Sequence, residues 1–128
     1  MSKTALHTEN APAAIGPYSQ AVQAGNTIYV SGQLPIDPKT GAFAGEDIKS
    51  QTRQSLTNIK SILAEAGCDM SAVVKTTVLL SDIADFGAMN EVYSEFFGDH
   101  KPARSCVEAA KIPKGALVEI ECIAVKSE

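Results

Sequence analysis

The stretch LVEIECIAVK, residues 117–126, indicates most about the fold, because its alternation predicts a β-strand with two dissimilar faces. One face is suited to a core beneath helices: Val118, Ile120, Cys122 and Ala124. The other face mixes two carboxylates with three large aliphatic side chains: Glu119, Glu121, Leu117, Ile123 and Val125. A sheet face left to water does not normally carry three such side chains, and the sequence offers no third helix to cover them. We therefore expect a partner subunit to cover this face.

Four earlier segments predict strands from their alternating or β-branched composition: 19–25, 27–31, 73–80 and 104–110. The first two are separated by Gly25-Asn26, which favours a tight turn. A short strand near Ala5 is a further alternative. Turn-forming residues predict an exposed loop at 35–41 and a turn at 111–115.

Two segments have helical spacing. Asp47 is a candidate N-cap for a helix that ends before Gly67, with an apolar stripe at Ile48, Thr52, Ser55, Leu56, Ile59, Ile62, Leu63 and Ala66. Asp82 or Asp85 caps a second helix that ends at Gly98. Its stripe is interpreted as core: Phe86, Met89, Tyr93, Phe96 and Phe97.

These elements follow the order β-β-α-β-α-β-β within one domain, residues 1–128. That order predicts an α+β fold, a mixed sheet with two helices on one face. If the last two strands pair as a hairpin, Arg104 shares a sheet face with Glu119 and Glu121.

Composition excludes several classes of function. The chain has 128 residues, a net charge of −4 and 11 scattered Lys and Arg residues, which argues against a nucleic-acid partner. Its three cysteines form no CxxC pair and its two histidines are far apart, so neither a metal site nor a disulfide framework is expected. No apolar run approaches the ~20 residues of a membrane span. No signal peptide follows Met1, so the expected location is the cytoplasm.

Arg104 is the strongest candidate for chemistry. A guanidinium on a partly apolar sheet face suits bidentate capture of a substrate carboxylate. The alternative is a structural cross-strand ion pair, which the spacing alone slightly favours.

The remaining candidates are weaker. Tyr18 follows the Gly-Pro turn that would fix its ring, although packing is the commoner role for such a tyrosine. Gly32, next to Ser31, would admit a ligand close to the backbone or merely serve the turn. Asn90 is off the apolar stripe of its helix, where solvation is the alternative. Cys106 has no histidine placed to activate it, which argues against a nucleophile.

The segment PARSCVE, residues 102–108, makes the chain resemble the RidA (YjgF) family. The likeness extends along nearly the whole chain, through GPYSQA at 16–21, VSGQ at 30–33, VKTTV at 74–78 and VEIE at 118–121. One departure is the loop at 98–101, which is shorter than in several relatives and would trim a pocket rim.

The resemblance implies a chorismate-mutase-like fold, assembled as a homotrimer whose sheets form a central barrel with sites in the clefts between subunits. It implies that Arg104 binds the substrate carboxylate and that Glu119 positions water or assists proton transfer, with Tyr18 completing the catalytic set. The residues implied to line the pocket are Ser31, Gly32, Asn90 and Cys106, the last through its backbone N–H. Glu119 rather than Glu121 is favoured by the family position only.

The implied activity is hydrolytic deamination, in which enamines and imines such as 2-aminoacrylate become 2-keto acids and ammonia. These carboxylate-bearing substrates are released by pyridoxal-phosphate enzymes, and the reaction requires neither a metal nor a cofactor. Two other functions stay open. The same pocket would suit a binding protein for 2-keto acids, and some relatives are described as ribonucleases or translation inhibitors.

Overall fold

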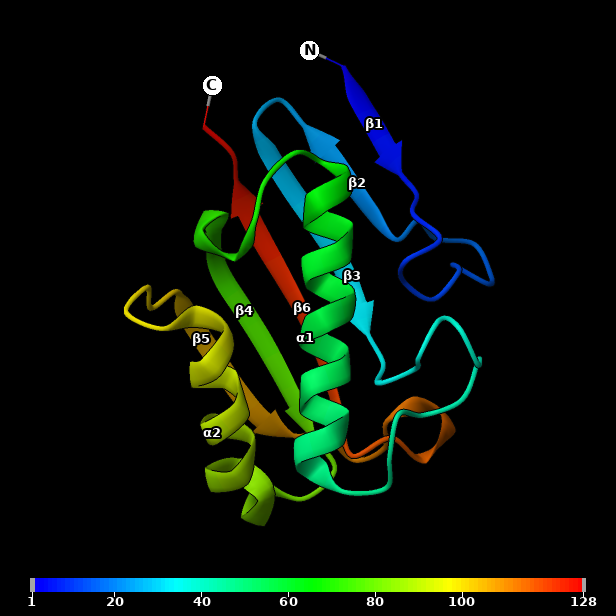
Figure 1. Ribbon diagram of the computed structural model, residues 1–128, viewed down its shortest axis with the longest axis vertical. Coiled ribbons are helices and arrows are strands. Elements are labelled where there is room, and N and C mark those ends of the chain that lie inside the picture. Colours follow the sequence, from blue (N-terminus) through cyan, green and yellow to red (C-terminus); the bar gives the residue numbers. More distant parts are fainter. Residues whose placement is uncertain (1, 128) are drawn as a thin grey trace.

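The structure, a computed structural model, describes residues 2–127. These residues form six strands: β1 (Lys3–Leu6), β2 (Ala21–Ala24), β3 (Thr27–Gln33), β4 (Val73–Leu80), β5 (Ala103–Glu108) and β6 (Val118–Val125). Two helices, α1 (Ile48–Glu65) and α2 (Phe86–Phe97), lie on one side of the sheet (Figure 1). The predicted α+β order is confirmed, with the short strand near Ala5 added in front.

The helix ends follow the local signals. Asp47 caps α1 by accepting a hydrogen bond from the Ser50 backbone N–H at 3.0 Å. Gly67 leaves the helix with a φ of +83°, a conformation that favours glycine. Of the two candidate caps for α2, Asp82 caps a short 3-10 turn, Ile83–Asp85, whereas Asp85 precedes α2 without a side-chain hydrogen bond.

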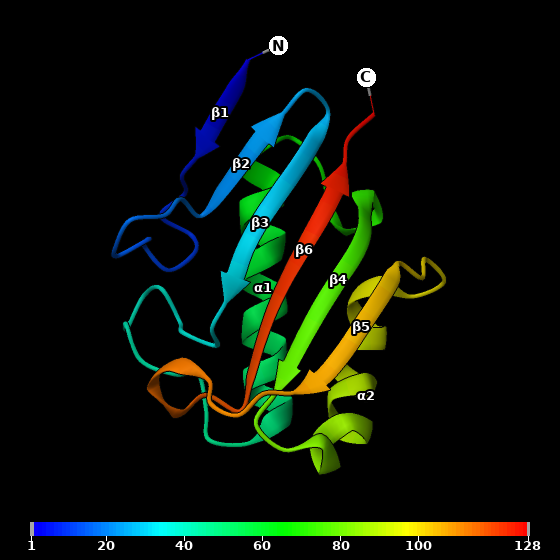
Figure 2. The same cartoon turned by 180° about the vertical axis from the view of Figure 1, so that it is seen from behind.

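The sheet has the order β1-β2-β3-β6-β4-β5, so β6 lies in its interior between β3 and β4 (Figure 2). β6 runs antiparallel to both neighbours, whereas β5 runs parallel to β4. The hairpin predicted between the last two strands is therefore wrong. α2 returns the chain to the end at which β4 began, so β5 is laid down parallel to β4 at the sheet edge.

This pairing places Arg104 and Glu119 on opposite faces of the sheet. Thr76 is the register partner of both Arg104 and Cys122, so Arg104 faces the helices together with the core. Glu119 pairs with Leu79 on the other face. The expectation that Arg104 shares a face with Glu119 and Glu121 is wrong within one chain.

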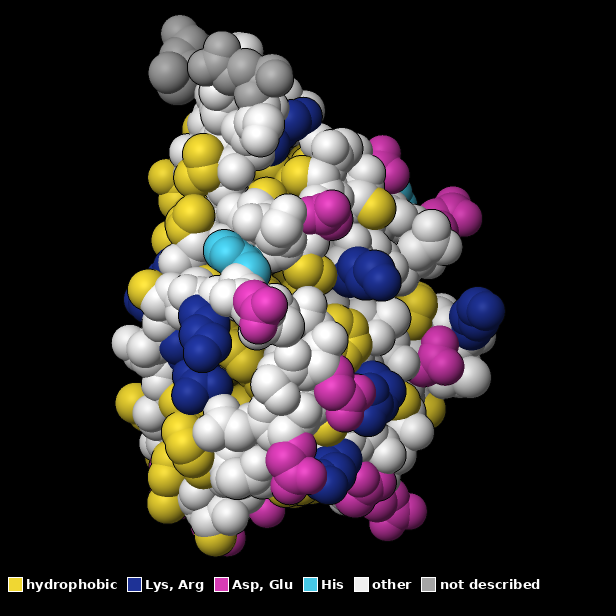
Figure 3. Space-filling view, turned by 60° about the vertical axis from the view of Figure 1, so that its left-hand side comes forward, with side chains coloured by type: hydrophobic (Ala, Val, Ile, Leu, Met, Phe, Trp, Pro, Cys, Tyr) yellow, Lys and Arg dark blue, Asp and Glu magenta, His cyan; other side chains and the backbone are white. Residues whose placement is uncertain are grey.

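The face of the sheet away from the helices is uncovered, as predicted from residues 117–126. Tyr29, Val107 and Val125 expose 51%, 50% and 46% of their surface on it. Figure 2 shows no helix in front of these strands, and in Figure 3 hydrophobic side chains gather along the left margin, towards which this face turns.

The loop after β3 is more buried than predicted. Asn58 of α1 donates hydrogen bonds to the carbonyls of Leu34 and Ile36 at 3.1 and 3.0 Å. Pro35 is buried, and within the predicted range 35–41 only residues 39–41 are exposed. The loop thus forms a fixed wall beside the end of β3.

No helix among residues 2–127 has the length and apolar character to cross a bilayer.

Candidate functional site

The candidate residues form two groups on opposite faces of the sheet. The first group lies around the end of β3 and the start of β6: Tyr18, Ser31, Gly32 and Glu119. The second lies between β5 and α2: Asn90, Arg104 and Cys106. Each group has a cavity of its own, of about 820 Å³ beside the first and about 620 Å³ beside Arg104 and Asn90. One chain therefore presents two half-sites, called here the glutamate half-site and the arginine half-site.

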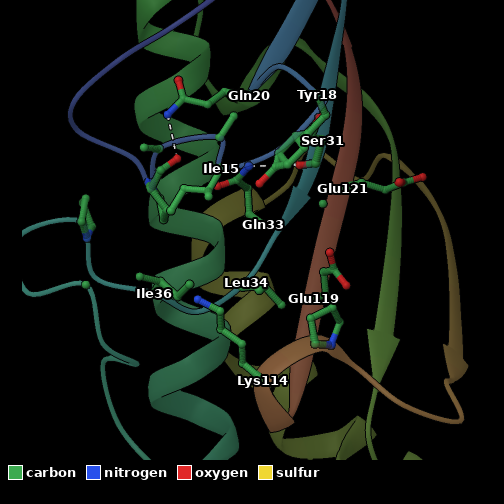
Figure 4. A pocket seen from close by; sticks show the side chains of 17 residues that line it. Ile15, Tyr18, Gln20, Ser31, Gln33, Leu34, Ile36, Lys114, Glu119 and Glu121 are labelled. Atoms are coloured by element: carbon green, nitrogen blue, oxygen red, sulfur yellow. Dashed lines mark hydrogen bonds between the residues drawn. The ribbon is translucent and has the colours of Figure 1, made fainter.

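A β-bulge shapes the glutamate half-site. Val30 pairs with Cys122 and Gln33 with Ile120, so Ser31 and Gly32 together occupy one step of the ladder. Such an extra residue bends a strand and redirects its side chains, and bulges are common beside functional sites. The Glu119 side chain comes from β6 and points towards the bulged end of β3 (Figure 4).

Gly32 makes room for the Glu119 carboxylate. A Cβ at position 32 would clash with Glu119 Oε2 and would stand 3.0 Å from its Cδ. The absence of a Cβ at position 32 therefore lets the Glu119 side chain approach the backbone of β3 closely, which is a role beyond that of serving a turn. Burial, and then the neighbouring charge of Glu121, raise the pKa of Glu119. A carboxyl with a raised pKa is suited to holding or transferring a proton nearer neutral pH.

The loop that carries Tyr18 is tied down by Gln20, a residue that the sequence reasoning missed. The buried Gln20 side chain accepts from the Thr8 N–H at 2.7 Å and donates to the Pro12 carbonyl at 2.8 Å. Ser31 holds the other end of the loop, because its hydroxyl donates to the Ser19 carbonyl at 2.6 Å. Tyr18 itself is 55% exposed, so its ring is not packed in the core.

Arg104 of the arginine half-site forms no ion pair with a carboxylate of residues 2–127. Its Nη1 donates to Asn90 Oδ1 at 2.6 Å. The ion pairs among residues 2–127 are Lys49–Glu91 and Arg53–Glu95, both between the helices. The structural ion pair considered for Arg104 is therefore wrong, as is simple solvation of Asn90. Here the guanidinium is held by an amide, and its charge remains available to an anion.

The aromatic stripe of α2 is only partly core. Tyr93 and Phe97 are buried, but Phe86 is 37% exposed. The guanidinium carbon of Arg104 lies 4.7 Å from the ring centroid of Tyr93 and 5.3 Å from that of Phe86. The three residues that contact the guanidinium share one face of α2, because they are spaced four and three residues apart: Phe86, Asn90 and Tyr93. This spacing is the signal in the sequence from which their common contact with one side chain could have been predicted.

Cys106 lies two residues along β5 from Arg104 and is half-buried. Burial raises the pKa of its thiol, while the charge of Arg104 acts in the opposite direction to a smaller extent. His100 is half-buried and donates from Nε2 to the Val73 carbonyl at 2.6 Å. His7 is exposed. Neither histidine is in recorded contact with the thiol, so Cys106 lacks the base that a nucleophile needs.

Replacing Cys106 by serine is expected to retain most of the activity, because the side chain has no covalent role. The measurement is kcat/KM of the purified Cys106→Ser protein on a 2-imino acid, the substrate class that the resemblance implies. Loss of the covalent nucleophile would lower the rate about a thousandfold or more, and a loss on that scale would contradict the assignment.

Comparison with known proteins follows this geometry. The family model described as Endoribonuclease L-PSP matches residues 8–126. The chain belongs to this family, the RidA (YjgF) family. Within residues 2–127, no cluster of three His, Cys, Asp or Glu side chains is arranged to hold a metal ion.

Members of the RidA family match this chain over nearly its full length. The 2-iminobutanoate/2-iminopropanoate deaminase of Salmonella typhimurium is 54% identical over 129 residues, 98% of this chain and 99% of that protein. The crystal structure of the Escherichia coli YjgF gene product superimposes with a TM-score of 0.93 at 50% identity, covering 97% and 99% of the two chains. The structure of E. coli TdcF with bound serine has a TM-score of 0.93 at 44% identity, covering 97% and 99%.

Proposed function

We propose that this protein is a 2-iminobutanoate/2-iminopropanoate deaminase, which hydrolyses reactive enamines and imines to 2-keto acids and ammonia. The observation that carries the proposal is the 54% identity, over nearly all of both chains, to the Salmonella enzyme of that name. The two half-sites are consistent with it. One offers a guanidinium that is held by Asn90 and forms no ion pair within residues 2–127, and the other offers a carboxyl with a raised pKa.

In the proposed reaction the enamine first tautomerises to an imine. Water adds to the imine carbon, its protons pass to nitrogen, and the C–N bond breaks to release ammonia and leave the 2-keto acid. An imine carbon is already electrophilic, so orientation and modest acid–base assistance suffice. The protein would act in the cytoplasm, beside the pyridoxal-phosphate enzymes that release such intermediates.

Each candidate residue has a role in this scheme. Arg104 binds the substrate carboxylate, and Asn90 orients its guanidinium. Glu119 positions water and transfers protons, beside the exposed Tyr18. Ser31 and Gly32 shape the wall on which the Glu119 carboxylate lies, and Cys106 contributes backbone rather than thiol. The contacts described above support the roles of Arg104, Asn90, Glu119, Ser31 and Gly32, and the family likeness supports those of Tyr18 and the Cys106 backbone.

The activity is tested by coupling a serine dehydratase to lactate dehydrogenase and following pyruvate from serine, with and without this protein. Pyruvate formation faster than spontaneous hydrolysis, and proportional to added protein, is expected. Unchanged pyruvate formation together with measurable binding of 2-oxobutanoate would instead indicate a binding protein. Cleavage of a single-stranded RNA without imine turnover would indicate a ribonuclease. The acidic net charge of −4 and the interspersed Lys, Arg, Asp and Glu side chains of Figure 3 argue against that reading.

We also propose that the functional unit is a homotrimer in which the sheets form a central barrel. The uncovered face, with Tyr29, Val107 and Val125 half-exposed, supports an apolar subunit contact. The position of the half-sites on opposite faces supports sites shared between subunits, since one copy cannot bring Arg104 to its own Glu119. Each complete site would then combine the arginine half-site of one subunit with the glutamate half-site of the next.

The assembly is expected to have a mass of about three times the 13.4 kDa chain by size-exclusion chromatography with light scattering at micromolar concentration. A stable monomer would contradict both the trimer and the shared site. The shared site has a sharper test in mixed assemblies. Arg104→Ala and Glu119→Gln chains, refolded together in equal amounts, should regain about one quarter of the wild-type sites, because each half-site is intact with an even chance. No regain would place both groups in one subunit.

A further inference from the structure

One face of α2 forms a slot for the guanidinium of Arg104. Phe86 and Tyr93 present their rings to it at 5.3 and 4.7 Å, and Asn90 between them accepts its hydrogen bond at 2.6 Å. The slot lies beside the cavity of the arginine half-site, which Tyr93, Asn90 and Arg104 line together. The two rings have no role in the proposed chemistry of water addition and ammonia release.

Tyr93 is the more firmly held of the two rings. Its hydroxyl shares a buried hydrogen bond of 2.7 Å with Thr76 Oγ1. Thr76 is fully buried and is the register partner of Arg104 on the neighbouring strand. The Tyr93 ring also packs against the ring of Phe97, whose centroid lies 4.6 Å from its own. The ring is thereby fixed to the same pair of strands that carries the arginine.

The choice of aromatic rings has a consequence for binding. A carboxylate partner would occupy the in-plane N–H donors of the guanidinium, which are the donors that a substrate carboxylate needs. A ring attracts the guanidinium through its face and leaves the in-plane donors free. Asn90 occupies only one of the five donors. The slot can therefore hold the cation in place without competing with a ligand.

We propose that Tyr93, tied to Thr76, is a positioning residue that fixes the plane of the Arg104 guanidinium for bidentate binding of the substrate carboxylate. The inference rests on the proposed function for its substrate, but the slot and its anion chemistry stand on the contacts alone. Without the ring, the long arginine side chain samples other rotamers and loses order that carboxylate binding then has to restore.

The test compares three variants on the assembled protein. Tyr93→Leu removes the ring, Tyr93→Phe keeps the ring and removes the hydroxyl, and Phe96→Leu is a matched control. Phe96 lies on the same helix and packs against the core, and the structure records no contact between its ring and Arg104. The measurements are kcat and KM for imine hydrolysis, the Kd of 2-oxobutanoate, and the melting temperature of each protein.

Tyr93→Leu is expected to raise both KM and the Kd of 2-oxobutanoate about tenfold, with kcat changed less than about threefold. Tyr93→Phe should recover most of that loss, because the ring face remains. Phe96→Leu should lower the melting temperature and leave KM and Kd unchanged. A folded Tyr93→Leu protein with wild-type KM and Kd would overturn the proposal, as would an equal rise in Phe96→Leu. If wild type hydrolyses no imine, the proposed enzyme activity fails, and the Kd values alone decide the role of Tyr93.

Discussion

Replacing Arg104 by alanine is expected to lower kcat/KM on the order of a hundredfold while the protein stays folded. A charge-assisted bidentate pair in a partly desolvated cleft contributes roughly 3 kcal/mol, and each 1.36 kcal/mol corresponds to a factor of ten in rate. Folding should survive because Arg104 is at the sheet edge and has no ion pair to lose. Arg104→Lys should also be badly impaired, because lysine keeps the charge without the planar fork.

The matched control is Arg53→Ala, which also removes an arginine. Arg53 pairs with Glu95 at 2.6 Å on the exposed side of the helices, and neither side chain lines the cavity of either half-site. Its loss should change stability slightly, as expected for a surface ion pair, and leave kcat/KM unchanged. A folded Arg104→Ala protein, with the oligomeric state of wild type and near-native imine hydrolysis, would remove Arg104 from the site.

Glu119→Gln is expected to lower kcat between a hundredfold and ten-thousandfold, the range typical of a lost general acid or base. Glu121→Gln is the control, because Glu121 lies two residues further along the same strand face and is exposed. Glu119 lies against Gly32, and burial raises its pKa. A larger loss at Glu121 would show that the catalytic carboxylate is one strand step away from the proposed position.

The same Glu119→Gln change is expected to stabilise the fold at alkaline pH. Because the pKa of Glu119 is raised in the native state, the unfolded chain loses this proton first as the pH rises. Below the ordinary glutamate pKa of 4.5, the protonated Glu119 carboxyl makes its full favourable contribution to the free energy of unfolding. This contribution is lost as the pH rises through the native pKa. The variant should therefore melt at a higher temperature than wild type at pH 8 and show no such gain at pH 4. A lower melting temperature at pH 8 would contradict a half-buried Glu119 carboxyl whose pKa is raised in the native state.

Local sequence signals were sufficient for the elements but not for all of their pairings. Asp47 and Gly67 lie at the two ends of α1 because caps depend on hydrogen bonds within a few residues. The partner of β5 depends instead on where α2 returns the chain, and adjacency in sequence wrongly suggested β6. The uncovered apolar face followed correctly from the alternation in 117–126, since both faces of a strand can be read from one segment.

The candidate site was predictable in part for the same reason. Arg104 and Glu119 could be selected from their chemistry and family position. The sheet face on which each side chain lies depends on strand register, and the register places the two on opposite faces of the sheet. An aromatic residue on a helical stripe is usually core, and Tyr93 is buried as that pattern predicts. Its contact with Arg104 depends on long-range pairing, because Thr76 is both the register partner of Arg104 and the hydrogen-bond partner of the Tyr93 hydroxyl. Gln20 carried no local signal at all, since its partners are 8 to 12 residues away.

The interior position of β6 has a consequence for how the protein is made. β6 is the last described element in chain order, yet it is the strand that pairs with both β3 and β4. While the ribosome is still adding residues before 118, no backbone pairing joins the β1–β3 ribbon to the β4–β5 pair, and the facing strand edges stay open. The sheet is therefore completed only once the chain has been made through β6, rather than from its N-terminal side onward. A nascent chain that stalls before Val118 lacks Glu119 and holds the β1–β3 ribbon and the β4–β5 pair as unconnected pieces, with two unpaired edges available to neighbouring chains.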